Sequence, residues 1–285
     1  MIKYWIFATR PKTLSASIGP VFIGVAMASQ TNLFSWDLAI ITGLCAVLLQ
    51  IGTNLANDYL DFLKGADKTS RKGPPRMVQQ GFISVNAMKR ATFLSFFIAF
   101  LIGLYLVYRS DLWILFVGIL SILGGYFYTA GKRPLAYLGL GDIMAFLFFG
   151  PVAVGGSYYI QTLSLSADVL VLGAGMGCLS TALLAVNNLR DYQEDKKANK
   201  RTLIVLLGTT FGRLEYSICL LTSWGILFWL CWGMLWCNIG IIALFFWMLV
   251  LVRGVYAGKN WQWQLEKTAS LLFFFPAILF LFLFL

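Results

Sequence analysis

The sequence lacks histidine altogether and contains little cysteine. None of the 285 residues is histidine and five are cysteine, with no C-x-x-C pair among them. The absence of histidine excludes a Ser-His-Asp triad, and together with the unpaired cysteines it excludes the usual zinc sites. We interpret the cysteines, which all lie in apolar stretches, as small packing residues.

Charge is also scarce. Charged residues make up 12% of the chain and hydrophobic residues 59%, whereas charged residues reach about 25% in an average soluble protein. The apolar runs are continuous rather than alternating, which favours membrane-spanning helices over a barrel. We therefore predict an all-α, polytopic membrane protein that forms one domain over residues 1–285.

Nine apolar stretches approach the roughly 20 residues that a bilayer requires, after an interfacial segment at residues 1–12. They are expected at 14–31, 37–62, 91–108, 112–130, 138–160, 167–189, 214–231, 236–252 and 268–285. The last of these is expected to face lipid and to carry no chemistry.

The basic residues give these spans a direction. All but Arg109 of the 22 Lys and Arg residues lie at the N-terminus or on alternate connections. The positive-inside rule then places the N-terminus and these connections on the cytoplasmic side, and we expect the spans to cross the inner membrane. This placement accounts for the net charge of +10, so we predict no nucleic-acid partner.

Four polar residues share one face at the end of the second span. Asn54, Asn57, Asp58 and Asp61 stand at offsets 0, 3, 4 and 7, which is the spacing of neighbours on one side of a helix. Carboxylates at membrane depth are costly, so they usually face the bundle interior and mark a functional site. We call this group the first acidic motif.

A second acidic motif repeats this pattern. Asn188, Asp191 and Asp195 each follow their counterparts in the first motif by 134 residues. The spans that carry the two motifs are expected to be parallel, so both motifs end at the same membrane face and can form one site. A loop rich in Lys and Arg follows each motif, at 63–90 and at 190–213.

Carboxylates beside cations indicate a magnesium-diphosphate site. Mg²⁺ is commonly held by one or two carboxylates together with phosphate oxygens, and Lys and Arg neutralise the remaining phosphate charge. A diphosphate site at the mouth of a lipid-embedded bundle suits a prenyl diphosphate. Tyr126 and Tyr128 could stabilise an allylic cation through their rings, although packing is the ordinary role of aromatic residues in so aromatic a chain.

The motifs resemble those of the UbiA superfamily of intramembrane aromatic prenyltransferases, over nearly the whole chain. The stretches that carry the resemblance are RPKTLSASIGPVFIG at 10–24, NDYLDFLKGAD at 57–67, GPPRMVQQGFIS at 73–84, YTAGKRPLAYLGLGD at 128–142 and NNLRDYQEDKKANKRTL at 187–203. Within the superfamily the chain is most similar to the branch that prenylates 1,4-dihydroxy-2-naphthoate, with loss of CO2, in menaquinone biosynthesis.

The resemblance implies roles for particular residues. Metal binding is implied for Asp58, Asp61, Asp67, Asp191 and Asp195, and diphosphate binding for Asn57, Lys68, Arg76, Lys132, Asn188 and Arg201. Tyr128 is expected near the reacting carbon.

The acceptor side of the site is less defined by the residues. Asp142 is a candidate catalytic residue that could accept a proton or orient the aromatic acceptor, or could instead form a salt bridge to Lys132 or Arg133. Arg10, Lys12 or Gln79 could bind an acceptor carboxylate, or could anchor the chain at the interface.

Two alternatives remain open at this stage. One is a prenyltransferase for a different acceptor: 4-hydroxybenzoate, homogentisate, a haem precursor or a lipid glycerol phosphate. The other is a cation transporter whose two acidic helices form a pathway. A pathway requires polar groups through to the opposite face, whereas here they gather at one face.

Overall fold

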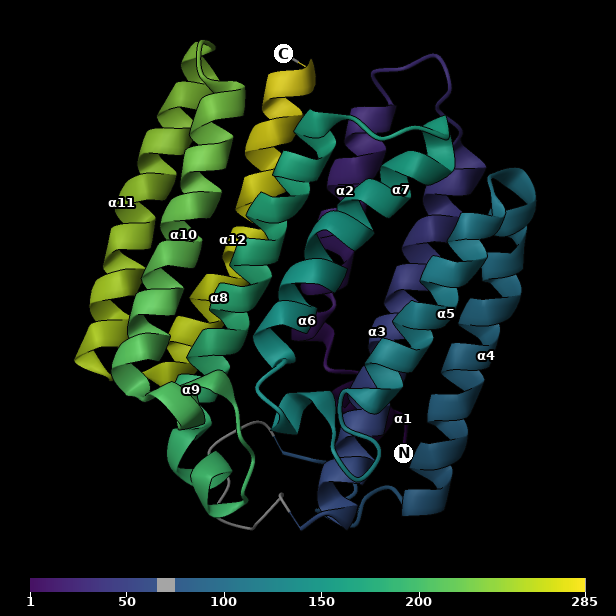
Figure 1. Ribbon diagram of the computed structural model, residues 1–285, viewed down its shortest axis with the longest axis vertical. Helices are drawn as coiled ribbons and strands as arrows, with labels where there is room; N and C mark the ends of the chain where they lie inside the picture. Colours follow the sequence, from purple (N-terminus) through teal and green to yellow (C-terminus); the bar gives the residue numbers. More distant parts are fainter. Residues whose placement is uncertain (66–74, 285) are drawn as a thin grey trace.

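The computed structural model describes residues 1–65 and 75–284, and all regular structure in those ranges is helical (Figure 1). The chain begins with two short elements, α1 (Ile2–Thr9) and the 3-10 turn η1 (Pro11–Thr13). The longer helices are α2 (Ser15–Ala28), α3 (Trp36–Leu63), α4 (Val85–Arg109), α5 (Leu112–Phe127), α8 (Ala167–Lys197), α10 (Thr209–Cys231), α11 (Leu235–Ala257) and α12 (Trp261–Phe284). Two short elements, η2 (Leu135–Tyr137) and α9 (Leu203–Leu207), lie in the connections.

Each of the nine expected spans corresponds to helical structure. In the described residues, seven helical segments are long and apolar enough to cross a membrane, while α2 and α5 are apolar but shorter. The prediction of an all-α, multi-pass membrane protein is therefore confirmed. The number of crossings and the cytoplasmic N-terminus stay predictions.

The expected span at 138–160 is one continuous helical segment built from three pieces: α6 (Gly141–Leu147), the π-helical turn η3 (Phe148–Val152) and α7 (Ala153–Thr162). Pro151 lacks the N–H that a regular helix needs, and Gly150 adopts non-helical angles there (φ −110°, ψ −109°). A Cβ on Gly150 would lie 2.6 Å from the carbonyl oxygen of Gly173 on α8. The absence of a side chain on Gly150 therefore lets the two backbones approach closely.

The helix α8 is central to the bundle. Its apolar residues, with those of α10, α11 and α12, form the largest buried cluster in the described part of the chain. The expectation that 268–285 only faces lipid is wrong for one side of α12, because Leu271, Leu272 and Phe275 are fully buried. This side packs against α2 and α8.

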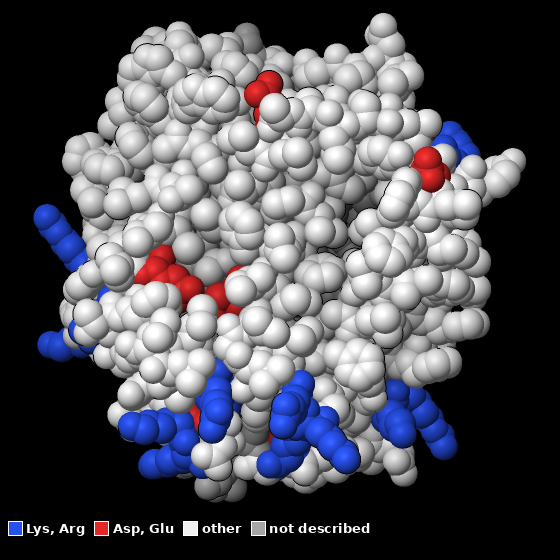
Figure 2. Space-filling view, in the orientation of Figure 1, with Lys and Arg blue, Asp and Glu red and all other residues white. Residues whose placement is uncertain are grey.

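Charge is distributed unevenly over the molecule. Figure 2 shows Lys and Arg gathered along the lower edge, the end at which the N-terminus lies in Figure 1, with acidic atoms in a hollow just above them. The C-terminal end of α12 lies at the opposite edge. The site is consequently to be sought near the basic end.

Candidate functional site

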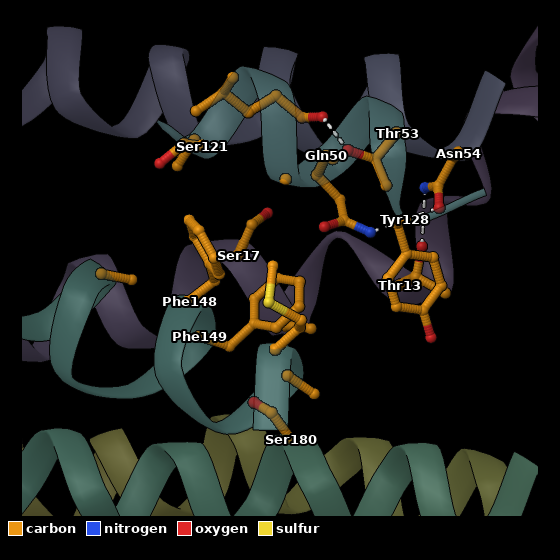
Figure 3. Close-up of a pocket in the computed structure, with 18 of the residues that line it drawn as sticks. Thr13, Ser17, Gln50, Thr53, Asn54, Ser121, Tyr128, Phe148, Phe149 and Ser180 are labelled. Atoms are coloured by element: carbon orange, nitrogen blue, oxygen red, sulfur yellow. Dashed lines mark hydrogen bonds between the residues drawn. The ribbon is translucent and has the colours of Figure 1, made fainter. Parts of the chain in front are cut away.

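A cavity of about 1240 Å³ lies inside the bundle. At one end it is lined by polar residues of both acidic motifs: Asn54, Asn57, Asp61, Asn188, Asp191 and Asp195. Elsewhere its wall is largely apolar and includes residues of α4 and α5 such as Phe100, Leu104 and Leu115. Figure 3 shows part of the cavity, where Phe148 and Phe149 lie across from Gln50 and Thr53 of α3. One space thus joins an acidic, cation-rich end to an apolar interior.

The first motif is held by contacts with distant residues. An Asp61 carboxylate oxygen accepts a hydrogen bond from Arg76 at 2.8 Å, and the other accepts one from the Tyr137 hydroxyl at 3.3 Å. The side-chain amide oxygen of Asn57 accepts a hydrogen bond from the Thr129 hydroxyl. Arg76 is only 4% exposed and also lines the cavity, so its cation is available at the cavity wall.

Asp58, which the resemblance implies as a metal ligand, points elsewhere. Its two carboxylate oxygens accept hydrogen bonds from the backbone N–H groups of Met77 and Val78, at 3.0 and 3.1 Å. It is absent from the residues that line the cavity. The geometry favours a structural role for Asp58, fixing the segment that carries Arg76, while its role as a metal ligand stays a prediction.

The second motif uses local partners. Arg190 donates to both carboxylate oxygens of its neighbour Asp191, at 2.6 and 2.7 Å, and also to the side chain of Asn187. One Asp195 oxygen lies 3.5 Å from the ammonium of Lys200. The other is buried and has no hydrogen-bond partner among the described residues. Within residues 1–65 and 75–284 it is therefore an acceptor that no donor satisfies.

Cations and aromatic rings surround the acidic groups. Lys64 and Lys200 lie over the ring of Tyr137, at 5.0 and 6.0 Å from its centre, and Lys64 also donates to the backbone carbonyl of Thr129. Partial desolvation holds the pKa of Lys64 below its usual value, opposed by the nearby charge of Asp61. Tyr137 thus positions two cations beside the first motif.

Two described residues that the resemblance implies as diphosphate ligands do not line the cavity. Lys132 and Arg201 are exposed and lie outside the wall. Asp67 and Lys68 lie outside the described residues, as does the side chain of Lys12. The sequence places Arg190 and Lys200 in the cation-rich loop after the second motif, but neither was predicted as an individual site residue, although a cation adjacent to, or five residues after, a motif carboxylate was a usable signal.

The residues considered for binding the acceptor or the allylic cation differ in whether they line the cavity. Arg10 and Tyr128 line the cavity, and Figure 3 shows the Tyr128 ring beside Thr13. Gln79 does not line it. Tyr126 packs against the buried cluster formed by α3 and the segment after Arg76, which supports its packing role.

Asp142 is 4% exposed, does not line the cavity, and has neither carboxylate oxygen hydrogen-bonded within the described structure. Lys132 and Arg133 are exposed, and no ion pair joins either of them to Asp142 in the described residues. The salt-bridge interpretation of Asp142 therefore finds no support.

The donor set fits a divalent cation that prefers oxygen. Carboxylate and amide oxygens from Asn57, Asp61, Asn188, Asp191 and Asp195 share one end of the cavity, and the partnerless Asp195 oxygen is a ready ligand. No group of three acidic, cysteine or histidine side chains in the described part stands at metal-binding distances. Asp61 and Asp191 would exchange their arginine partners for the cation.

Comparison with known proteins agrees with this geometry. Residues 17–283 match the model of the UbiA prenyltransferase family. The chain is 40% identical to the 1,4-dihydroxy-2-naphthoate octaprenyltransferase of Haemophilus influenzae, over 77% of this chain and 74% of the relative. It is 37% identical to the protein of the same name from Mycobacterium tuberculosis, over 84% of this chain and 82% of the relative.

The fold also matches solved structures. A UbiA homolog from Archaeoglobus fulgidus, bound to GPP and Mg²⁺, superimposes with a TM-score of 0.71 and 13% identity, covering 99% of this chain and 100% of that one. The apo structure of a UbiA homolog from Aeropyrum pernix gives a TM-score of 0.69, with 13% identity and coverage of 95% and 98%. With a family match over nearly its whole length and relatives this similar, the chain belongs to the UbiA prenyltransferase family.

Proposed function

We propose that this protein transfers a polyprenyl group from polyprenyl diphosphate to 1,4-dihydroxy-2-naphthoate, releasing diphosphate and CO2 and forming demethylmenaquinol. Relatives at 35–40% identity carry the name of that octaprenyltransferase, and they support the choice of acceptor. The proposed cofactor is Mg²⁺, which accompanies a prenyl diphosphate in a structural neighbour. The proposed location is the inner membrane, with the site facing the cytoplasm.

The observation that carries the proposal is the two-sided cavity. Its apolar interior, bounded by α4, α5 and the helical segment from α6 to α7, suits a hydrocarbon chain, while both acidic motifs and several cations meet at its other end. A substrate with an anionic head and a long apolar tail would satisfy both parts at once. A soluble phosphate ester or a simple cation would leave one of them unused.

The residues at the polar end divide the work. Arg76, Arg190 and Lys200 would turn from their carboxylate partners to the diphosphate oxygens. The carboxylates so released, with Asn57 and Asn188, would hold the cation. When bound, Mg²⁺ would neutralise the charge that develops on the departing diphosphate.

Tyr128 is placed to act on the other product of that bond cleavage. It lines the same cavity as both acidic motifs and the apolar wall. An allylic cation formed there would face the negative side of an aromatic ring, in a cavity whose walls restrict water. Arg10, at the same cavity, would bind the carboxylate of the acceptor.

The direct experiment is product mass spectrometry on the purified protein in lipid, supplied with a prenyl diphosphate, Mg²⁺ and 1,4-dihydroxy-2-naphthoate. The expected product carries the prenyl group and lacks the carboxyl group. Parallel reactions with 4-hydroxybenzoate and homogentisate are expected to give no product. Prenylation of one of those instead would move the proposal to a different acceptor, and no product or diphosphate from any acceptor would overturn it.

A further inference from the structure

One polar residue extends the first acidic motif away from Asp61, and the proposed roles of the cation and the diphosphate do not involve it. Gln50 lies on the same face of α3 as Asn54 and Asn57, one turn before Asn54, and it lines the cavity. In the second motif the corresponding position, 134 residues later, is occupied by Leu184, which also lines the cavity. Gln50 is therefore particular to the first motif.

Hydrogen bonds fix how the Gln50 amide is turned. The side-chain nitrogen of Asn54 donates to the backbone carbonyl of Thr9 and to the Thr13 hydroxyl, both at 2.9 Å. Because a carbonyl can only accept, the Asn54 oxygen must face the other way, where it accepts from the Nε2 of Gln50 at 3.3 Å. The Gln50 oxygen, Oε1, is consequently turned away from Asn54, as Figure 3 shows.

The Oε1 of Gln50 is an acceptor at the cavity wall that no donor in residues 1–65 or 75–284 satisfies. Within those ranges the side chain of Gln50 makes one hydrogen bond, the one to Asn54. An amide oxygen in an apolar space is costly to leave unpaired, so such groups are normally hydrogen-bonded. Phe148 and Phe149 lie across from Gln50 in Figure 3 and offer apolar ring faces. The donor therefore has to come from a molecule in the cavity.

Of the components of the proposed reaction, the aromatic acceptor is the one that can supply this donor. The prenyl chain is hydrocarbon, and diphosphate only accepts hydrogen bonds. Gln50 and Asp61 are also separated by a helical rise of about 16 Å along α3, so the amide is remote from the carboxylates that would hold the cation. The acceptor carries two hydroxyl groups, and its flat ring suits the faces of Phe148 and Phe149.

The carboxylate of the acceptor selects between these two hydroxyl groups. In 1,4-dihydroxy-2-naphthoate the 1-hydroxyl stands next to the carboxylate and donates to it within the molecule, so the 4-hydroxyl is the free donor. Arg10, which would bind the carboxylate, directly follows Thr9, and its backbone carbonyl accepts from the Thr13 hydroxyl at 2.9 Å. The segment that anchors the relay to Gln50 thus also carries the proposed carboxylate ligand.

We propose that Gln50 selects the aromatic acceptor by accepting a hydrogen bond from its 4-hydroxyl, with Asn54 holding the amide in that orientation. The inference rests on the proposed prenyl transfer and adds to it a residue that distinguishes acceptors. A ring with a free hydroxyl at this position pairs Oε1, whereas a ring without one leaves it unpaired. Sites built to bind a substrate hydroxyl in this way reject the analogue that lacks it.

The first test is acceptor binding without turnover, measured anaerobically by calorimetry on the protein in lipid nanodiscs with Mg²⁺ and inorganic diphosphate. The two ligands are 1,4-dihydroxy-2-naphthoate and 1-hydroxy-2-naphthoate, which differ only in the 4-hydroxyl, and empty nanodiscs correct for partition into lipid. Wild type is expected to bind the dihydroxy compound about tenfold more tightly, the effect of one hydrogen bond and of the oxygen left unpaired without it. In Gln50→Met, which removes the amide from a side chain of similar length, this ratio should fall to within about twofold.

Ser121→Ala is the matched control, because Ser121 also lines the cavity but its hydroxyl donates to the Val117 carbonyl of its own helix. It should keep the wild-type ratio. A ratio that stays at the wild-type value in Gln50→Met would overturn the proposal. Equal binding of the two ligands by wild type would also overturn it, since water would then satisfy the amide. Binding of neither ligand by wild type would instead refute the proposed acceptor, and with it the proposed function.

Gln50→Glu separates the two ends of the amide, and it decides the matter if Gln50→Met does not fold. A carboxylate cannot donate to Asn54, but it retains the acceptor and accepts more strongly than an amide. Both ligands should bind more weakly beside the added negative charge, while the ratio between them should be at least that of the wild type. A ratio near one in this variant would overturn the assigned hydrogen bond.

The second test uses turnover. Gln50→Met should raise KM for 1,4-dihydroxy-2-naphthoate about tenfold and leave KM for the prenyl diphosphate within about twofold, because the lost hydrogen bond belongs to the acceptor alone. An equal rise in both KM values would indicate a general loss of structure and refute the selective role. An unchanged KM for the acceptor would refute it as well, while leaving prenyl transfer by the wild type intact.

Discussion

The two acidic motifs have the same spacing but are held in different ways. In the first motif, on α3, Asp61 pairs with Arg76 fifteen residues away, and Asp58 binds the backbone of the same distant segment. In the second motif, on α8, Asp191 pairs with the adjacent Arg190, and Asp195 with Lys200 five residues on. The first motif is organised by tertiary contacts and the second by its own helix and the turn after it.

This difference shows that a repeated spacing does not give repeated roles. The offset-3 and offset-7 positions line the cavity in both motifs, and these carry the matched Asn57, Asp61, Asp191 and Asp195. The extra acid of the first motif, Asp58, turns to the loop and has no counterpart in the second. Four predictions test how far the two motifs differ.

The largest effect is expected from Asp61→Asn and Asp191→Asn. Each nearly isosteric change removes a carboxylate from the shared end of the cavity, so Mg²⁺-dependent product formation should fall by at least about a hundredfold, the size of effect produced by removing one electrostatic group from a reacting centre. Expression should be preserved. Wild-type rates in both variants would show that the motifs do not form one site.

The next effect separates two neighbouring cations after the second motif. Lys200→Ala should raise KM for the prenyl diphosphate about tenfold or more, because a hydrogen bond between charged groups contributes about 1.5–3 kcal/mol. Arg201→Ala is the matched control and should stay within about twofold, since Arg201 is exposed and outside the cavity wall. A larger rise in KM for Arg201→Ala than for Lys200→Ala would instead support diphosphate binding by Arg201, the role that the resemblance implies for it.

Asp58→Asn should act mainly on stability. An amide can accept only through its oxygen, so one of the N–H groups of Met77 and Val78 loses its acceptor, at a cost of about 1–3 kcal/mol. We expect a lower unfolding temperature and an unchanged Mg²⁺ concentration for half-maximal rate. A rise in that concentration, without loss of thermal stability, would identify Asp58 as a metal ligand.

The smallest effect is expected from Lys132→Ala. Its side chain is exposed and does not line the cavity, and surface substitutions of this kind usually change energies by less than about 0.5 kcal/mol. Rate and KM, measured beside Lys200→Ala, should match the wild type. A tenfold rise in KM would mean that the segment after α5 moves onto the diphosphate.

Hydropathy and helical spacing were sufficient to predict much of this molecule. Long apolar runs must form helices in lipid, so the spans follow from composition, and the offsets of the acidic residues put Asp61, Asp191 and Asp195 at one cavity. Spacing along one helix does not reveal what lies across from it, however. The direction of Asp58, the break at Pro151 and the isolation of Asp142 depend on contacts between segments far apart in the chain.

Glu215 illustrates the same limit at a helix end. Hydropathy places the start of that span at 214, which makes Glu215 an interfacial charge. The helix instead begins at Thr209, so Glu215 is carried inside the bundle. The preceding stretch TTFGRL contains Gly212 and Arg213, which weaken its apolar signal, and in the structure α10 packs against α8 and α9.

The helix α8 is longer than the hydrocarbon layer of a bilayer, which bears on where the substrate's polar and apolar parts would lie. Its 31 residues extend about 46 Å at the usual helical rise, whereas the hydrocarbon layer is only about 30 Å thick. The polar residues that exceed this thickness are at the end of α8 that carries the second motif. Asp191 and Asp195 can therefore stand at the level of the lipid head groups, while the rest of the helix lies in the hydrocarbon layer. The diphosphate of the substrate could then remain at the head-group level and its prenyl chain in the hydrocarbon layer. The carbon–oxygen bond that breaks would lie at the boundary between the two.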